Sequence, residues 1–377
     1  MLWIPGPTEV RPEILAECSR PAIGHRSPAM RELIERIDQH LYHAFGLAED
    51  SSVLCAVHSV SASGLMEASL RGVGNRVLSV VNGAFSKRYR DMAQLVGKQV
   101  TTLEIPWGSG VTAPQLERAL TEDGPFDALT LVSNETSTGV LTPLAPLTEV
   151  LQRHPETLFL VDLVSYIAGA PVDFEAHGID FGFAGVQKAF ALPPGIAVCA
   201  VSERYMNAAR TQVDRGWALD PVRIVDGHVN RKTPATPCTP LYYALARQLE
   251  DITSGATLPE RDRGLTGSDA WTARFAKHLR MRDRTHDWAA GHGLTPFPAD
   301  GFRSPTVSCI AAGELDTGAL VSGLQQKAYE ISNGYGDLKG RTFRIGHMGD
   351  HSEEDLEGLL HAADEVIADI RSVAAGS

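Results

Sequence analysis

The hydrophobic and polar positions of the chain alternate between two spacings from about residue 50 to residue 255. Short apolar runs are separated by stretches in which apolar residues recur every three or four positions, as in amphipathic helices. Seven runs are predicted as strands: Val53–Val57, Arg76–Val81, Gln99–Leu103, Ala128–Ser133, Leu158–Asp162, Ile179–Ala184 and Ile196–Val201. Helical spacing is found at Gly64–Arg71, Ser86–Leu95, Ala113–Leu120 and Leu144–Gln152. This alternation predicts an α/β fold with a mainly parallel sheet covered by helices on both faces.

The pattern changes after residue 255. A long helical stretch, rich in Arg and His, is predicted from about Pro259 to Gly291. After it we predict an apolar strand-like run at Pro305–Ile310, a helix at Thr317–Gln326, a strand at Thr342–Ile345 and an amphipathic helix at Glu353–Val373. This order predicts a smaller α+β domain at 256–377, which the N-terminal segment 1–14 joins, beside a large domain at 15–255.

Composition narrows the class of protein. The chain has 377 residues, 43% of them hydrophobic, which is enough for a large core. Its formal net charge of -12 argues against nucleic acids and anionic membranes as partners. No apolar run has the length of a membrane span. The start, Met1–Pro7, lacks the basic and long apolar regions of a signal peptide, so a cytoplasmic location is expected.

The cysteines do not form a recognisable framework. There are five of them, scattered and without a C-x-x-C pair: Cys18, Cys55, Cys199, Cys238 and Cys309. We therefore expect reduced thiols, with neither a disulfide scaffold nor a metal site.

Two polar residues follow predicted strands that should be buried. Asp162 ends one apolar run, and Lys188 comes shortly after the next. Taken singly, such an Asp is most often a helix cap and such a Lys most often reaches solvent. Taken together they suggest chemistry, because a poorly solvated lysine becomes a nucleophile towards an aldehyde. A buried carboxylate can hold a positively charged ring nitrogen. One crossover unit separates the two residues, so they can end neighbouring strands.

These residues, with the motifs below, make the chain resemble the class V aminotransferases, enzymes of fold type I that use pyridoxal phosphate (PLP). It is similar to the phosphoserine and alanine/serine–glyoxylate aminotransferases from Pro5–Thr8 to Phe343–Gly349. The resemblance implies a large domain with a seven-stranded, mainly parallel sheet in an α/β/α sandwich. It also implies that Lys188 binds the cofactor covalently, that Asp162 pairs with its ring nitrogen and that Gln187 contacts its phosphate.

A turn of small residues is the candidate phosphate site. Ser61, Ala62 and Ser63 open the helix predicted at Gly64–Arg71. Exposed N–H groups and the helix dipole attract a phosphate there, although an ordinary capped helix has the same pattern. The resemblance places the family's phosphate loop at this position, with Ala62 where glycine is usual.

Two further segments match cofactor contacts of the family. Phe85, in Asn82–Ser86, occupies the position of the aromatic residue that lies on the cofactor ring, although a core position is the alternative. The stretch Asn134–Gly139 resembles the family's H-x-E-[ST]-S-T-G motif. It implies that Thr136 donates a hydrogen bond to the ring hydroxyl oxygen, where the alternative is a polar turn.

The segment Thr233–Pro237 resembles one that reaches into the active site of a partner subunit. The resemblance implies that Thr236 binds the partner's cofactor phosphate, and hence a homodimer with shared active sites. The same residues are also common in turns.

Substrate contacts are predicted at both ends of the chain. Arg344 lies in an apolar run, and its planar guanidinium matches a carboxylate. The resemblance assigns it to the substrate α-carboxylate, and a structural ion pair is the alternative. Phosphoserine-type relatives carry the pair His25–Arg26 for the substrate phosphate, whereas a surface loop is the other interpretation.

The sequence therefore predicts a transaminase that acts on a small L-amino acid and a 2-oxo acid. His25–Arg26 favours phosphoserine or glutamate with 2-oxoglutarate, and the overall resemblance favours alanine or serine with glyoxylate. A cysteine desulfurase-type lyase is a remoter alternative, because it needs a cysteine in a mobile loop and Cys309 lies in a strand-like run. A binding module without activity is disfavoured, because Lys188, Asp162 and Arg344 are all present.

Overall fold

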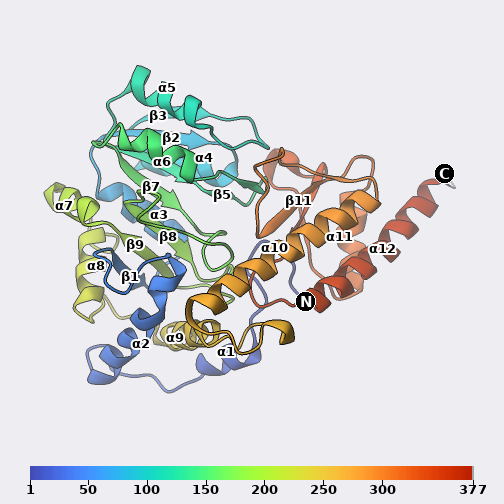
Figure 1. Ribbon diagram of the computed structural model, residues 1–377, viewed down its shortest axis with the longest axis horizontal. Coiled ribbons are helices and arrows are strands. Elements are labelled where there is room, and N and C mark those ends of the chain that lie inside the picture. Colours follow the sequence, from blue (N-terminus) through green and yellow to red (C-terminus); the bar gives the residue numbers. More distant parts are fainter. Residues whose placement is uncertain (376–377) are drawn as a thin grey trace.

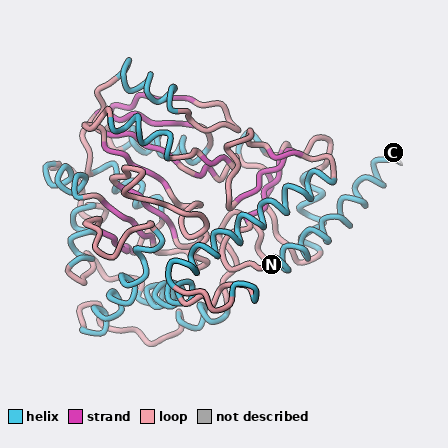
Figure 2. The backbone as a smooth tube through the Cα atoms, in the orientation of Figure 1, coloured by secondary structure: helices cyan, strands magenta, loops and turns pink. Residues whose placement is uncertain are grey.

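A seven-stranded sheet forms the centre of the larger part of the computed structural model, which describes residues 1–375 (Figures 1 and 2). The strands are β1 (Leu54–His58), β2 (Arg76–Val81), β3 (Gln99–Glu104), β4 (Ala128–Val132), β7 (Leu158–Asp162), β8 (Phe181–Gly185) and β9 (Ala197–Val201). Their order is β1-β9-β8-β7-β4-β2-β3, and β9 runs antiparallel to both of its neighbours. The seven predicted strands and the mainly parallel sheet are confirmed.

Helices cover both faces of this sheet (Figure 1). They are α1 (Pro12–Glu17), α2 (Pro28–Ala44), α3 (Ala62–Arg71), α4 (Ala84–Leu95), α5 (Ala113–Asp123), α6 (Ala145–Gln152), α7 (Glu203–Thr211), α8 (Pro221–Val229) and α9 (Thr239–Thr253). Alternate strand residues face opposite sides: Phe159 and Val161 pack with α2, α5, α6 and α9, whereas Leu158 and Leu160 pack with α3, α4, α7 and α8. Burial on both faces explains why these strands are apolar throughout.

A smaller four-stranded sheet lies beside the large one. It is ordered β10 (Thr295–Pro296), β11 (Val307–Ala311), β13 (Thr342–Gly346) and β12 (Ser332–Asn333), all antiparallel. Helices α10 (Gly267–Gly291), α11 (Thr317–Gln326) and α12 (Glu353–Ala375) accompany it, with short 3-10 turns at Glu260–Asp262 and Gly336–Leu338. The predicted α+β unit is therefore present. No helix within residues 1–375 has the length and apolar character of a membrane span.

One helix boundary was predicted wrongly. The helical stretch expected from Pro259 is interrupted, and α10 begins only at Gly267. Gly264 and Gly267 both adopt positive φ angles, which lie outside the right-handed helical region and separate the 3-10 turn from α10.

The N-terminal segment contacts both parts of the molecule. Trp3 is fully buried in the core of the smaller sheet, and Leu2 forms a parallel bridge with Glu330. Ile14, by contrast, packs into the core of the large sheet. The domain boundaries at residues 14 and 255 stay a prediction, but the segment does join the C-terminal unit at its start.

A small ribbon follows β4 and turns towards the C-terminal unit. Strands β5 (Asn134–Glu135) and β6 (Val140–Leu141) pair antiparallel, and Val140 forms a further bridge to Arg303. The turn between the two strands therefore lies where the two sheets approach each other.

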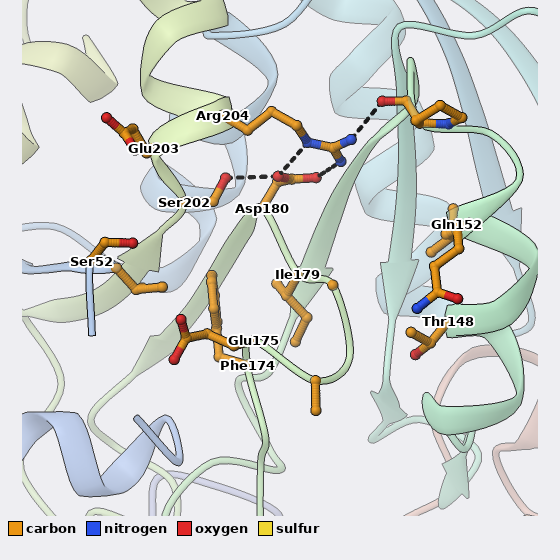
Figure 3. A pocket seen from close by; sticks show the side chains of 15 residues that line it. Ser52, Thr148, Gln152, Phe174, Glu175, Ile179, Asp180, Ser202, Glu203 and Arg204 are labelled. Carbon is orange, nitrogen blue, oxygen red and sulfur yellow. Dashed lines mark hydrogen bonds and ion pairs between the residues drawn. The ribbon is translucent and has the colours of Figure 1, made fainter. Parts of the chain in front are cut away.

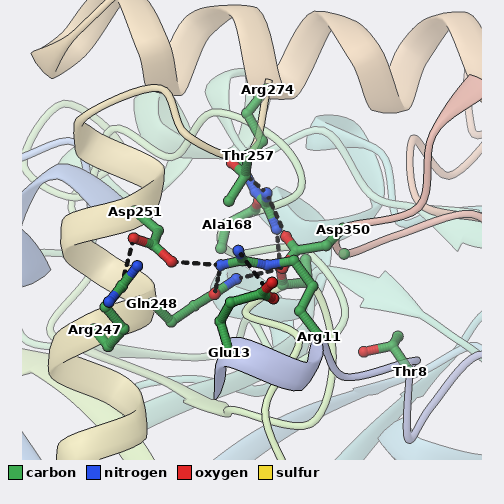
Figure 4. Close-up of polar contacts among 12 residues, drawn as sticks. Thr8, Arg11, Glu13, Ala168, Arg247, Gln248, Asp251, Thr257, Arg274 and Asp350 are labelled. Carbon is green, nitrogen blue, oxygen red and sulfur yellow. Dashed lines mark hydrogen bonds and ion pairs between the residues drawn. The ribbon is translucent and has the colours of Figure 1, made fainter. Parts of the chain in front are cut away.

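A buried polar network connects the large sheet to the C-terminal unit (Figure 4). Arg274 of α10 is fully buried and donates to Asp350 Oδ1 at 2.8 Å and to the carbonyl of Ala189 at 2.6 Å. Asp350 Oδ2 accepts from Arg11 Nε at 2.7 Å and from Gln248 Nε2 at 2.9 Å. Burial alone would raise the pKa of Asp350, but Arg274 and the other nearby cations outweigh it and lower the pKa to about 2.

Replacing Asp350 by Asn should leave buried Arg274 without a counter-charge. We expect the free energy of unfolding at neutral pH to fall by about 3–5 kcal/mol, measured by urea denaturation. Because folding lowers the pKa of Asp350, its contribution is complete above the ordinary value of about 4 and is lost as the pH falls towards about 2. Glu357→Gln, which breaks the exposed pair with Arg284, is the matched control and should change stability far less. Equal losses in both variants would contradict this role of Asp350.

Candidate active site

A cavity of about 260 Å³ lies at the carboxyl ends of β4, β7 and β8. Ligands of open α/β sheets bind at this edge, because the loops after parallel strands meet there. Eight of the predicted cofactor residues line the cavity: Ser61, Ala62, Ser63, Phe85, Thr136, Asp162, Gln187 and Lys188. The structure thus brings together residues that are spread over more than a hundred positions of the chain.

Lys188 lies in the loop after β8, under the N-terminal segment. Its ammonium group donates to the carbonyl of Pro5, and its own carbonyl accepts from Thr8 Oγ1 at 2.9 Å. Burial and, less strongly, the nearby Arg344 lower the pKa of Lys188 to about 8, against the opposing effect of Asp162. A substantial fraction of the amine is therefore uncharged near neutral pH, as a nucleophile requires.

Asp162 is the last residue of β7 and is 5% exposed. Its Oδ1 accepts from the backbone N–H of Val164 at 2.8 Å. Burial raises the pKa of Asp162 to about 7, against the effect of this hydrogen bond. Among residues 1–375 no Lys, Arg or His forms an ion pair with it. A positively charged ring nitrogen in the cavity would complete this arrangement.

The start of α3 provides an open anion site. Ser61 is the N-cap residue, but its side chain makes no capping hydrogen bond, so the first N–H groups of the helix stay available. Space is preserved by Gly185, where a Cβ atom would lie 2.4 Å from Gln187 Oε1 and 3.2 Å from Ala62 Cβ. A phosphate group fits this corner of the cavity.

Phe85 and Thr136 form another part of the wall. Phe85 stands in the first turn of α4 and is half-buried. Thr136 lies in the turn between β5 and β6, and its hydroxyl donates to Ser165 Oγ at 2.9 Å. Both positions are compatible with the predicted ring stacking and hydrogen bond, which stay predictions.

Arg344 projects from β13 and is only 7% exposed. Its guanidinium donates to the carbonyl of Thr136 at 3.2 Å and to the carbonyl of Asn333 at 3.2 and 3.3 Å. No Asp or Glu side chain of the part of the chain that the structure describes forms an ion pair with it. This disfavours a structural ion pair and leaves the charge available for a carboxylate ligand.

Four predicted site residues are not among those that line the cavity of the same chain: Arg344, which contacts its wall at Thr136, and His25, Arg26 and Thr236. His25 and Arg26 form the turn before α2, where His25 is half-buried and Arg26 is exposed. Thr236 is exposed beside a separate hollow of about 150 Å³ that His58 and Trp217 also line. The predicted roles of His25, Arg26 and Thr236 therefore stay predictions.

Six cavity residues were not predicted from the sequence: the apolar Met66, Val132 and Val164, and also Gly6, Arg88 and Asn134. A Cβ atom on Gly6 would lie 2.4 Å from Lys188 Nζ, so only glycine leaves room for the lysine. Arg88 follows Phe85 by one helical turn, and its guanidinium lies 4.9 Å from the ring centroid. Gly6 and Asn134 lie inside motifs that the sequence showed, and Arg88 follows such a motif by two positions. Nearness to these motifs was the signal that could have identified them.

PLP fits these observations. The cavity combines an amine with a lowered pKa, a buried carboxylate without a cation, an uncapped helix start and an aromatic ring. Cys309, by contrast, is 1% exposed in β11, and burial raises the pKa of its thiol to about 11. Such a thiol is a poor nucleophile, which disfavours the desulfurase alternative.

A larger hollow of about 510 Å³ lies at a different place, beside the start of β8 (Figure 3). Its buried carboxylate, Asp180, already pairs with Arg204 and accepts from Ser202 Oγ at 2.7 Å. These polar groups satisfy one another, so this hollow offers no reactive group for catalysis.

The lowered pKa of Lys188 makes the capture of an aldehyde depend on pH. Only the neutral amine reacts, so the rate constant for covalent PLP binding by cofactor-free protein should rise as the pH increases through about 8 and then level off. Stopped-flow absorbance measures this rate, and borohydride reduction with peptide mass spectrometry should locate the label on Lys188. Lys188→Ala is the control. A rate that keeps rising above about pH 10, as for an ordinary lysine, would contradict the prediction.

Known proteins resemble the chain over nearly its whole length. A serine–glyoxylate aminotransferase from Methylorubrum extorquens is 30% identical, with 98% of this chain and 91% of the relative covered. The crystal structure of an alanine–glyoxylate aminotransferase from Nostoc sp. matches with a TM-score of 0.85 and 27% identity, over 97% of this chain and 94% of that one. A phosphoserine aminotransferase from Cytophaga hutchinsonii shares the fold, with a TM-score of 0.84, but only 21% identity, over 97% and 98% of the two chains.

The family model for aminotransferase class-V matches residues 60–255, just over half of the chain. This segment contains Asp162 and Lys188 and all strands of the large sheet except β1. The expected fold type I is confirmed by the solved structures. By this match and the full-length similarity, the chain belongs to the class V aminotransferases, which are PLP-dependent transferases that exchange amino groups between amino acids and 2-oxo acids.

Proposed function

We propose that this enzyme transfers the amino group of a small L-amino acid, such as alanine or serine, to glyoxylate. The observation that carries the proposal is the buried guanidinium of Arg344, which has no carboxylate partner within residues 1–375 and acts on the charge of Lys188. A carboxylate held there places the substrate α-carbon near the amine. The same site serves an amino acid and a 2-oxo acid, because both carry this carboxylate.

The choice of glyoxylate over phosphoserine chemistry rests on sequence identity. The relatives named for glyoxylate are 30% and 27% identical to the chain, whereas the phosphoserine aminotransferase is 21% identical. His25 and Arg26, which led us to expect phosphoserine first, do not line the cavity of their own chain and so give no support to either substrate here. The alternative from the sequence is therefore the better-supported proposal.

Three residues have separate roles in the proposed reaction. PLP, when bound, supplies an aldehyde that condenses with amino groups and a ring that withdraws electrons. Lys188, once its amine is free, takes the proton from the substrate α-carbon and returns a proton as a general acid. Asp162 holds the proton on the ring nitrogen, and Arg344 orients the substrate through its carboxylate. Donor and acceptor use one site in turn, so ping-pong kinetics follow.

The assembly we propose is a homodimer with shared active sites. Thr236 is exposed and does not line the cavity of its own chain, which agrees with the role that the family resemblance gives it, at the cofactor phosphate of a neighbouring subunit. His25 and Arg26 likewise do not line the cavity of their own chain. A cytoplasmic location is part of the same proposal.

The amino donor can be identified from single half-reactions. Alanine, serine, phosphoserine, glutamate and cysteine would each be added to the holoenzyme without an acceptor, and the visible absorbance of the bound cofactor followed. We expect alanine or serine to bleach it at least about ten-fold faster than phosphoserine, and glyoxylate to restore it. Fast bleaching by phosphoserine, restored by 2-oxoglutarate, would reverse the assignment. No bleaching by any amino acid would exclude transamination of these donors.

Arg344 should act on substrate binding and not on cofactor binding. Arg344→Gln removes the charged fork, so we expect kcat/KM for the amino acid to fall by about 100-fold. The dissociation constant for PLP should change less than about three-fold, because Arg344 does not contact the cradle at α3. Arg341→Gln, in the exposed approach to the same strand, is the matched control. A loss of PLP affinity equal to the loss in kcat/KM would refute the assignment.

A further inference from the structure

Glu135 is a fully buried carboxylate that the proposed reaction does not use. It is the second residue of β5, directly before Thr136 of the cavity wall, and is 0% exposed. Within residues 1–375 it forms no ion pair with a Lys, Arg or His side chain. Burying an unpaired carboxylate is costly, so its retention indicates that its charge is used.

Hydrogen bonds from two segments converge on this carboxylate. Oε2 accepts from the backbone N–H of Ser86 at 2.8 Å and of Phe85 at 3.1 Å, both in the first turn of α4. Oε1 accepts from Ser137 Oγ at 2.6 Å and from the Ser137 N–H at 3.1 Å. These groups act as donors to both oxygens, as an ionised carboxylate requires. The positive end of the α4 dipole adds to the stabilisation.

The contacts fix the part of α4 that carries Phe85. The two N–H groups that Glu135 accepts from include that of Phe85, the aromatic residue of the cavity wall. The approach is so close that a Cβ atom on Gly83 would lie 2.3 Å from Glu135 Cγ. A shift of Glu135 would therefore move the start of the helix and with it the ring.

The charge of Glu135 also acts on the reactive groups. It opposes ionisation of Asp162, adding to burial in raising the pKa of that carboxyl, whereas Lys188 and Arg88 act in the opposite direction. It also favours the positive charge of Arg344, although burial outweighs it and lowers the pKa of that guanidinium. Neutral donors hold Glu135, and within residues 1–375 no cation forms an ion pair with it.

We propose that Glu135 is a positioning residue whose fixed negative charge anchors Phe85 at the start of α4 and strengthens proton retention at the pair formed by Asp162 and the cofactor ring nitrogen. If Asp162 holds the ring nitrogen, the second negative charge of Glu135 would favour a positive charge on that nitrogen more than Asp162 alone does. This inference concerns cofactor binding, so it does not depend on which amino acid the enzyme uses.

The test uses PLP binding without catalysis. In a Lys188→Ala background the amine no longer contributes to the pH dependence, and the dissociation constant for PLP can be measured by protein fluorescence over roughly pH 5.5 to 9. Binding should weaken as the pH falls through the pKa of Asp162, about 7, because a protonated Asp162 no longer attracts the ring nitrogen. The titrations of the ligand itself are the same in every variant, so differences between variants come from the protein.

Three substitutions separate charge from structure. Glu135→Gln keeps the size but removes the charge, so the inflection should move to lower pH by about half a pH unit or more. Glu135→Asp keeps the charge, and its inflection should stay with that of the parent. Ser137→Ala removes one hydrogen-bond donor but no charge, and should lower the melting temperature without moving the inflection.

The outcomes are distinct. An unchanged inflection in Glu135→Gln, with lower thermal stability, would show a purely structural residue and overturn the proposal. The same shift in Glu135→Asp as in Glu135→Gln would assign the effect to geometry and overturn it as well. In addition, Glu135→Gln should weaken PLP binding less in a Phe85→Ala background than in its presence, and strictly additive losses would refute the link to Phe85.

Discussion

The burial of Lys188 beside Asp162 is the constraint on which the rest of this structure depends. Removing an amine and a carboxylate from water disfavours both charges, which lowers the pKa of Lys188 and raises that of Asp162. The lowered pKa of Lys188 and the raised pKa of Asp162 have different chemical consequences. The first yields a nucleophile and base near neutral pH, and the second leaves a carboxyl group that ionises fully only beside a cation. A cofactor with an aldehyde and a basic ring nitrogen satisfies both groups together.

Several distant segments keep this pair out of water. The N-terminal segment covers Lys188 through Pro5 and Thr8, and Gly6 leaves the space that the lysine occupies. Behind the lysine, Arg274 holds the carbonyl of Ala189 and pairs with Asp350. The C-terminal unit therefore supports the active site, because its polar network holds in place the loop that carries Lys188.

Charged side chains of both signs lie in and beside the cavity. Arg88 and Asp162 line the cavity, whereas Arg344 and Glu135 lie beside it and contact its wall. Arg344 is held only by backbone carbonyls, and Glu135 by backbone N–H groups and hydroxyls. Because neutral groups fix these charged side chains, their fields are not cancelled locally and act on whatever binds between them.

The sequence alone determined the large sheet and most of the cofactor site. Strands buried on both faces must be apolar throughout, so runs such as Leu158–Asp162 were visible without any structure, and polar residues directly after them marked the reactive edge. The motifs for Lys188, Asp162 and the α3 turn rest on such local patterns. Tertiary structure decided what depends on packing between distant segments. It showed that Arg344 has no carboxylate partner in the described chain and that Gly6 makes room for Lys188. It also placed His25, Arg26 and Thr236 outside their own cavity, and it showed that the α10 boundary depends on two glycines with positive φ angles. Which charged side chains pair, which residues are buried and which glycines adopt positive φ angles all depend on contacts between distant parts of the chain. No run of neighbouring residues determines these features by itself.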